Sequence, residues 1–118
     1  MTPILDANAL YKRGFELRCE GRYIESKAEL QKVLQLDPNH LAAKWQLGLI
    51  QGFEGDFEGS LVTLQRLANE NPTHTNIRYD LAMTQMMLGM YAEACENLRL
   101  VLKQDPNHEN ANRQVTYC

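Results

Sequence analysis

The chain has 118 residues, a length that suits one domain able to bury a core without disulfide or metal staples. Hydrophobic residues make up 44% of the sequence and charged residues 23%, a composition that excludes a disordered chain. The formal net charge is −3, and no basic cluster is present, so we expect no nucleic-acid partner.

Six helices in three pairs are predicted along the chain. The first pair spans about 7–20 and 24–36, the second about 41–54 and 58–70, and the third about 75–88 and 92–104. Apolar residues at steps of three and four support the second helix of each pair, as in Leu61, Leu64, Leu67 and Ala68. Strand-like alternation is absent. The sequence therefore predicts an all-α fold.

A seventh helix is expected to begin in residues 109–118. Its Ala111, Val115 and Cys118 are predicted to lie on the exposed end of the stack. End repeats of stacked helical proteins need a polar covering. Because this segment is short, we expect the last hairpin to be partly bare and available for association between copies of the chain.

Three markers recur with a period of 34 residues: prolines at 38, 72 and 106, glycines at 21, 55 and 89, and an aromatic residue two positions after each glycine. Each glycine is predicted to end a first helix in the left-handed conformation. Each proline ends a second helix, and the Asp or Asn beside it is expected to cap the next helix. The period predicts one domain over residues 1–118, with repeats at about 7–40, 41–74 and 75–108 and a partial capping helix at 109–118.

Residues 7–108 resemble the tetratricopeptide repeat (TPR) family. The resemblance rests on the Gly-x-aromatic turns, the terminal prolines, the pairs Leu47-Gly48 and Leu81-Ala82, and small residues at 26, 60 and 94. It implies a right-handed α-solenoid of three helix-turn-helix hairpins that binds other proteins. The sequence departs from the family pattern where Leu17, Gln51 and Gln85 replace a mid-helix tyrosine.

In the TPR family the first helix of each repeat lines a concave groove. Carried over by repeat position, this predicts a peptide-binding groove of Asn8, Tyr11, Phe15, Trp45, Leu49, Phe53, Asn76, Tyr79, Met83, Met86 and Met87. The exposed rings and methionines would form an adaptable apolar surface, and the two asparagines would hydrogen-bond the backbone of a ligand. The alternative is that some rings, Trp45 and Phe15 especially, pack sideways between helices as part of the core.

One TPR subfamily grips acidic peptide tails with lysine, arginine and asparagine side chains. The corresponding cations are missing from this sequence, and Asp80 would repel a carboxylate. An apolar clamp is therefore expected in their place.

No catalytic residue, metal site or cofactor is predicted. His40, His74 and His108 share the 34-residue period, which places them too far apart to hold one metal ion, and their position is typical of helix starts. Motifs for a serine nucleophile, a phosphate loop or a zinc protease are absent.

The compartment is predicted from the termini and the cysteines. Met1–Asp6 has no basic or apolar region typical of a secretory leader, and no apolar stretch approaches the roughly 18 residues needed to cross a bilayer. Cys19, Cys95 and Cys118 form an odd set without a CxxC pair, which fits a reducing compartment better than a disulfide framework. We therefore expect a cytoplasmic protein without membrane insertion.

Three functions stay open from the sequence. The first is an adaptor that binds an apolar peptide or helix in the groove. The second is an assembly or secretion chaperone that shields a hydrophobic client. The third is a structural scaffold that assembles with itself through the C-terminal hairpin.

Overall fold

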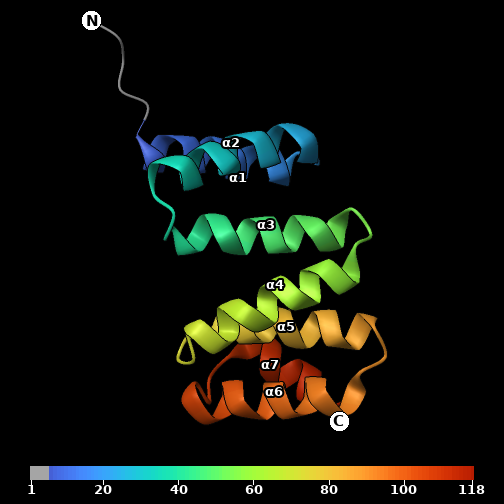
Figure 1. The fold of residues 1–118 in the computed structure, drawn as a ribbon. Coiled ribbons are helices and arrows are strands. Elements are labelled where there is room, and N and C mark those ends of the chain that lie inside the picture. Colours follow the sequence, from blue (N-terminus) through green and yellow to red (C-terminus); the bar gives the residue numbers. More distant parts are fainter. Residues whose placement is uncertain (1–5) are drawn as a thin grey trace, which may run out of the picture.

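The computed structural model describes residues 6–118, which form seven helices and no strand (Figure 1). The helices are α1 (Ala7–Cys19), α2 (Tyr23–Leu36), α3 (Leu41–Phe53), α4 (Phe57–Glu70), α5 (Thr75–Met87), α6 (Tyr91–Gln104) and α7 (Glu109–Val115). The predicted bounds of the first six differ from these by at most one residue, and the predicted all-α solenoid is confirmed. The expected absence of a secretory leader concerns residues 1–5, which lie outside the described part.

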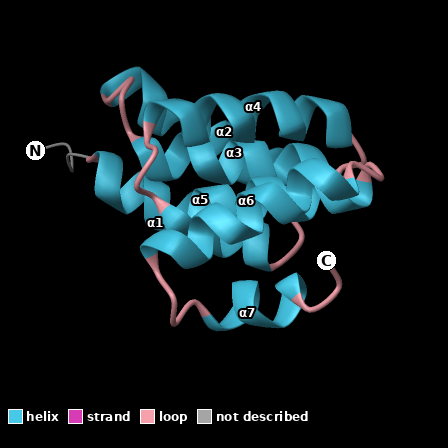
Figure 2. Cartoon of the chain, turned by 90° about the horizontal axis from the view of Figure 1, so that it is seen from below, coloured by secondary structure: helices cyan, strands magenta, loops and turns pink. Residues whose placement is uncertain are grey.

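The helices pair as the hairpins α1–α2, α3–α4 and α5–α6. The second helix of one hairpin packs against the first helix of the next, as in α2 with α3 and α4 with α5. Figure 1 shows the resulting stack, with the N-terminal hairpin at one end and α6 and α7 at the other. Seen from below in Figure 2, α7 lies at the edge of the stack near the C-terminus.

The turn inside each hairpin depends on a glycine. Gly21, Gly55 and Gly89 have φ angles of 78°, 92° and 75°, in the left-handed region that other residues avoid. The predicted role of these glycines is thus confirmed. Because the same turn recurs, each second helix leaves its first helix in the same direction, and the three hairpins stack regularly.

Small residues let the two helices of a hairpin approach closely. The Ser26 hydroxyl donates a hydrogen bond of 2.6 Å to the Gly14 carbonyl, and Ser60 donates one of 2.7 Å to Gly48. A Cβ atom on Gly14 would lie 2.9 Å from the side chain of Leu30, too close for a normal contact. These pairs account for the glycine and small-residue positions of the repeat pattern.

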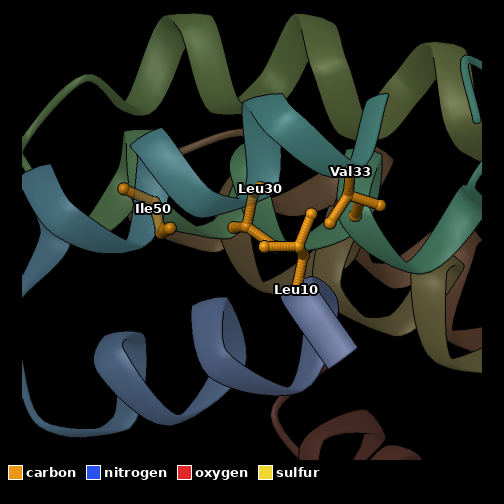
Figure 3. Packing of buried hydrophobic residues seen from close by; sticks show 5 residues of the cluster. Leu10, Leu30, Val33 and Ile50 are labelled. Carbon is orange, nitrogen blue, oxygen red and sulfur yellow. The ribbon is translucent and has the colours of Figure 1, made fainter. Parts of the chain in front are cut away.

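The core is divided among three clusters of buried apolar side chains: the first two join neighbouring hairpins, and the third joins the last hairpin to α7. In the first, Leu10 of α1, Leu30 and Val33 of α2, and Ile50 of α3 converge (Figure 3). Leu30, Val33 and Ile50 have no exposed surface. The second cluster joins α4 to α5, and the third joins α5 to α6 and α7. Each repeat is therefore held by its neighbours as well as by its own hairpin.

Helices α3, α5 and α7 begin at histidines. The Nδ1 atoms of His40, His74 and His108 accept hydrogen bonds of 3.1, 3.2 and 3.1 Å from backbone N–H groups three residues later. The expectation that the Asp or Asn beside each proline caps the next helix is therefore wrong. The side chains of Asp37 and Asp105 instead accept hydrogen bonds inside the proline turn, from the N–H groups two residues on.

The end of the stack is closed more tightly than the sequence indicates. Ala111 of α7 is fully buried in the third cluster, and Val115 packs against the same cluster. The prediction that these side chains lie on the exposed end of the stack is wrong. These two side chains lie on successive turns of a short helix, and they cover part of the apolar surface of α5 and α6.

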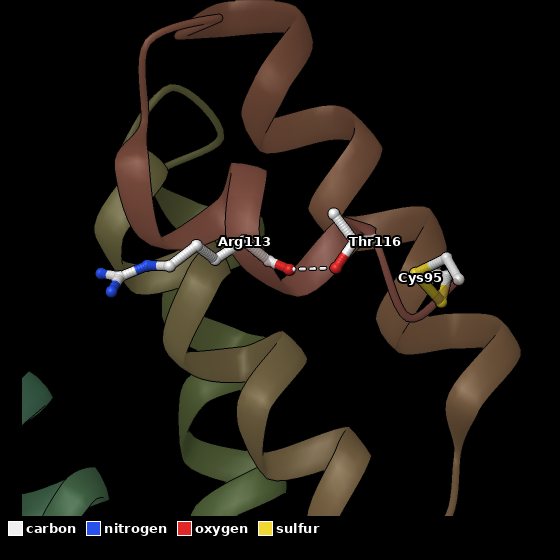
Figure 4. The surroundings of a disulfide bond; sticks show 4 residues. Cys95, Arg113 and Thr116 are labelled. Atoms are coloured by element: carbon white, nitrogen blue, oxygen red, sulfur yellow. Dashed lines mark hydrogen bonds between the residues drawn. A yellow bond between two sulfur atoms is a disulfide. The ribbon is translucent and has the colours of Figure 1, made fainter.

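A disulfide bond joins Cys95 of α6 to Cys118, just beyond α7 (Figure 4). It contradicts the expectation that the cysteines stay unpaired, which was one basis for the predicted cytoplasmic location. Cys19 is free and exposed. Close to the bond, the Thr116 hydroxyl donates a hydrogen bond of 2.7 Å to the Arg113 carbonyl, which tightens the last turn of the chain (Figure 4).

Candidate peptide-binding site

A pocket of about 450 Å³ opens between the second and third hairpins. Helix α3 contributes Leu49, Gly52 and Phe53, the start of α4 contributes Phe57 and Ser60, and α5 contributes Asp80, Met83, Thr84 and Met87. We call this hollow the α3–α5 pocket. Its residues on α3 and α5 recur at steps of three and four, so each helix presents one face to it. The walls are mostly apolar, and the pocket is large enough to hold one side chain of a bound segment.

Four of the predicted groove residues line this pocket: Leu49, Phe53, Met83 and Met87. Phe53 and Met87 are 52% and 66% exposed, which is unusual for such large apolar side chains. Leu49 and Met83 are half-buried and pack against the second and third core clusters. The pocket therefore has a fixed floor and a wall whose apolar surface is in contact with solvent.

Three groove aromatics form a ladder with the histidine caps. Tyr11, Trp45 and Tyr79 occupy the same position in successive repeats. Their rings lie 5.2, 5.0 and 5.2 Å from the rings of His40, His74 and His108, respectively, measured between centroids. Each contact joins the first helix of one repeat to the start of the next. These aromatics are half-buried, so they help to hold the repeats together.

Trp45 is also tied to the next repeat by a hydrogen bond. Its indole N–H donates to the Asp80 carboxylate at 2.8 Å, from α3 to α5. The ring packs against the second core cluster. Trp45 therefore packs sideways between helices, as the alternative prediction has it, and its ring is not fully open to the groove. Phe15, by contrast, is 36% exposed and does not belong to a core cluster.

Asp80 is an ionisable group in apolar surroundings. Burial raises the pKa of its carboxyl above the usual value, while the hydrogen bond from Trp45 and the positive charge of Arg18 act in the opposite direction. Among residues 6–118, no lysine, arginine or histidine forms an ion pair with this carboxylate. The carboxylate therefore reaches the pocket without a cation in contact.

Arg18 connects the first hairpin to the pocket. Its guanidinium lies 4.9 Å from the centroid of the Phe15 ring and 5.7 Å from that of Phe53. The Phe53 ring stacks in turn on Tyr23, with 5.8 Å between centroids. Such cation–π contacts contribute roughly 0.5–1 kcal/mol each at exposed sites. They orient Phe53 at the rim of the pocket without burying it.

The remaining predicted residues lie away from the pocket. Asn8 is exposed near the start of α1, and Met86 packs against the third core cluster. Asn76 is exposed, and its Oδ1 lies 2.9 Å from Nε2 of His108. Because Nδ1 of His108 accepts from a backbone N–H, a neutral ring carries its proton on Nε2 and donates to Asn76. The amide NH₂ of Asn76 is then left facing solvent.

Comparison with models of known protein families identifies the repeat. Two family models described as tetratricopeptide repeats match the chain, one at residues 54–113 and the other at residues 7–40. The chain belongs to the tetratricopeptide repeat family. The matched segments include the pocket-lining residues Phe57 to Met87 and the first hairpin. No curated protein sequence matches this TPR chain significantly.

Solved TPR structures share its fold at low sequence identity. MamA from Desulfovibrio magneticus RS-1 superposes with a TM-score of 0.80 and 21% identity, over 95% of this chain and 63% of that one. YrrB, described as a TPR protein with an unusual peptide-binding site, also gives a TM-score of 0.80 with 21% identity, over 94% of this chain and 57% of that one. The TPR chain thus spans less than two thirds of the length of these proteins.

Within residues 6–118 of the TPR chain, no helix is long and apolar enough to cross a membrane. No group of three or more His, Cys, Asp or Glu side chains in this part of the chain is arranged to hold a metal ion. The three periodic histidines instead cap helices and contact aromatic rings, as described above.

Sequence reasoning missed three features of the site. The Trp45–Asp80 hydrogen bond spans 35 residues, one repeat plus one position, and this spacing is the signal that points to it. Phe57 is one of the periodic aromatics that follow the turn glycines, and it also lines the pocket, which the repeat pattern does not indicate. Arg18 lies over two phenylalanine rings, and nothing in its sequence position indicates this contact.

Proposed function

We propose that this TPR protein-interaction module binds an apolar segment of a partner protein, with the α3–α5 pocket as the main anchor site. The observation that carries the proposal is the exposed apolar rim of the pocket at Phe53 and Met87. Large apolar side chains in contact with water favour association, because covering them releases the surrounding water. The proposed ligand is a peptide or helix with an apolar anchor that enters the pocket.

Residues next to the pocket extend the proposed site along the first helices. Phe15 and Arg18 lie beside Phe53 and would contact the chain of the ligand on one side. The free amide NH₂ of Asn76 would donate to a ligand carbonyl on the other side. We propose that Tyr11, Trp45 and Tyr79 act mainly by holding the repeats at a fixed spacing, and that Asn8 and Met86 contribute less than predicted.

The comparison with YrrB supports this reading, since that protein is described as having a peptide-binding site and shares the fold. TPR proteins in general are interaction modules, and we propose a non-catalytic role for this one. We also propose that the repeats at 7–40, 41–74 and 75–108 act together as a single domain, because the first two core clusters are each shared between neighbouring hairpins.

A chaperone role is a second candidate, favoured by the methionines at the pocket. Met83 and Met87 have flexible, polarizable side chains that adapt to differently shaped partners. Such a surface suits several hydrophobic clients better than one. The two roles differ in one measurable property: a client of a chaperone loses solubility when the TPR protein is withdrawn, and a partner of an adaptor does not.

The test uses a library of N-acetylated random peptides, selected for binding to the unaltered protein. Binders are then measured by fluorescence anisotropy against a Phe53→Ala/Met87→Ala variant. Full burial of one such side chain contributes about 1.5–3 kcal/mol, and about half of this surface is still exposed here. The two losses together amount to about 1.5–3 kcal/mol, so the double variant should weaken binding about 10- to 150-fold.

The matched control removes two exposed apolar side chains elsewhere. Ile24 and Val62, on α2 and α4, are 79% and 65% exposed, and neither lines the pocket. An Ile24→Ala/Val62→Ala variant should bind as the unaltered protein does. Equal losses in both variants, or no loss in the pocket variant, would contradict the proposal. This pair is a cleaner probe than Trp45 and Tyr79, whose loss also removes contacts between repeats.

A further inference from the structure

Asp80 is the only charged residue among those that line the α3–α5 pocket. Its neighbours there are apolar side chains, a glycine and the hydroxyl-bearing residues Ser60 and Thr84. Both hydroxyls are already used inside the protein: Ser60 donates to the Gly48 carbonyl, and Thr84 donates to the backbone carbonyl of Asp80. The carboxylate is thus the one strong polar group that the pocket offers to a ligand.

One oxygen of this carboxylate is engaged and the other is open. Oδ2 accepts the indole N–H of Trp45 at 2.8 Å. Within residues 6–118, Oδ1 accepts no hydrogen bond, and it is not among the buried polar atoms that lack a partner. Oδ1 therefore has surface in contact with solvent, and Asp80 is one of the residues that line the pocket. An acceptor in this position can bond a donor that enters from outside.

The charges around Asp80 leave this oxygen without a cation. The positive charge of Arg18 favours the ionised form of Asp80, but its guanidinium is held over the rings of Phe15 and Phe53 and, within residues 6–118, forms no ion pair with that carboxylate. The rings of His74 and His108 use Nδ1 to accept backbone N–H groups, which requires that nitrogen to be unprotonated. A carboxylate in apolar surroundings that has no cation in contact with it costs free energy. A cationic group of a ligand would offset that cost.

We propose that the α3–α5 pocket selects a lysine side chain of the bound segment, with its ammonium group on Oδ1 of Asp80 and its aliphatic stem against Leu49 and Met83. This inference rests on the proposed function, since it names the residue that the bound segment places in the pocket. A lysine has both parts that the pocket requires: four methylene groups for the apolar walls and a charged end for the carboxylate.

The geometry favours lysine over arginine and over a free chain terminus. Arginine binds carboxylates best through two parallel hydrogen bonds, and at Asp80 one of these would have to share Oδ2 with the indole N–H of Trp45. The ammonium group of lysine is a compact charge that needs only one oxygen. The amino terminus of a peptide carries the same charge, but it has no aliphatic stem to cover the pocket walls.

The test compares selections from the N-acetylated peptide library, in which no free amino terminus is present. Peptides selected on the unaltered protein should be enriched in lysine at one position. Peptides selected on Asp80→Asn should not be, because asparagine keeps an acceptor for Trp45 and removes the charge. Glu58→Gln, which removes an exposed acid from the nearby start of α4, is the matched control and should keep the lysine preference.

A second measurement uses one selected peptide and its copy with norleucine in place of lysine. Hydrogen bonds to charged groups contribute about 1.5–3 kcal/mol, so norleucine should bind the unaltered protein about tenfold more weakly or worse. For Asp80→Asn the two peptides should bind equally. The inference is overturned if norleucine binds as well as lysine to the unaltered protein, or if the lysine preference survives in Asp80→Asn.

The two proposals fail in different ways. Selected peptides that depend on Phe53 and Met87 but show no lysine preference would refute the lysine inference and leave the proposed function standing. Selected peptides that are insensitive to the Phe53→Ala/Met87→Ala change would refute the proposed function, and the lysine inference with it. Enrichment in arginine at the same position would refute the choice of lysine.

Discussion

The disulfide between Cys95 and Cys118 should stabilise the C-terminal end of the stack, and Cys118→Ser removes it. The bond closes a loop with a sequence separation of 23 residues. In the chain-entropy model, a cross-link over a loop of this length lowers the entropy of the unfolded chain enough to stabilise the fold by about 3 kcal/mol. Cys118 is exposed, so the serine variant should lose this contribution and little packing.

The effect should be largest at α7. This helix has only seven residues, too few to be stable alone, and it depends on Ala111 and Val115 packing against α5 and α6. Without the bond, amide hydrogen exchange in α7 should speed up by far more than exchange in α1 and α2. The free energy of unfolding from urea titrations should fall by about 3 kcal/mol.

A Cys19→Ser background removes the free thiol and prevents exchange between cysteines during the measurement. In that background, a reducing agent should destabilise the parent protein and leave Cys118→Ser unchanged. Thiol titration of the folded, oxidised parent should detect no reactive cysteine. Two reactive thiols, or stability that is insensitive to reduction, would refute the reasoning.

Two further predictions concern single side chains. Burial raises the pKa of Asp80, so the neutral carboxyl favours the folded state. This stabilising contribution is fully present below the pKa of the unfolded chain and is lost as the pH rises through the folded pKa. Asp80→Asn should therefore gain stability relative to the parent between pH 3 and pH 7 in urea titrations, and a relative loss over that range would contradict it. His74→Ala should cost about 1 kcal/mol through loss of the cap on α5, whereas His74→Asn should recover most of it; equal unfolding midpoints for the two variants would exclude the capping role.

The fold was predictable because the sequence repeats its turn chemistry. Gly21, Gly55 and Gly89 occur where only glycine adopts the required angles easily, so their spacing locates every hairpin turn. Prolines locate the ends of the second helices for an equally local reason. Helix bounds followed to within one residue. Local steric rules of this kind can be read from a single sequence.

Contacts between repeats were less predictable, since they depend on how side chains meet across helices. Trp45 was expected to face the groove, but it packs on a core cluster and donates to Asp80. Met86 has the right repeat position for the groove and turns toward α6 and α7 instead. The Cys95–Cys118 bond depends on α7 folding back along α6, which no cysteine spacing indicates.

In the second and third hairpins, a glutamine on the first helix accepts a hydrogen bond from a polar side chain on the second helix. Gln51 accepts the Thr63 hydroxyl at 2.7 Å, and Gln85 accepts the Asn97 amide at 2.7 Å, each pair separated by 12 residues. These glutamines stand where the family pattern has tyrosine. In each pair the partner on the second helix donates to the side-chain carbonyl oxygen of the glutamine that replaces the tyrosine. The departures from the family pattern at these two positions are thus compensated inside the same hairpin.

Asp80 is different, because the fold does not require its charge. The equivalent position one repeat earlier is Gln46, a neutral side chain that is 5% exposed. The hydrogen bond from Trp45 needs only an acceptor, which an asparagine would supply equally well. An ionised group that lowers stability, in a position where the preceding repeat has a neutral one, is the kind of local inconsistency found at functional sites. The charge at Asp80 is therefore better explained by what enters the pocket than by what holds the repeats together.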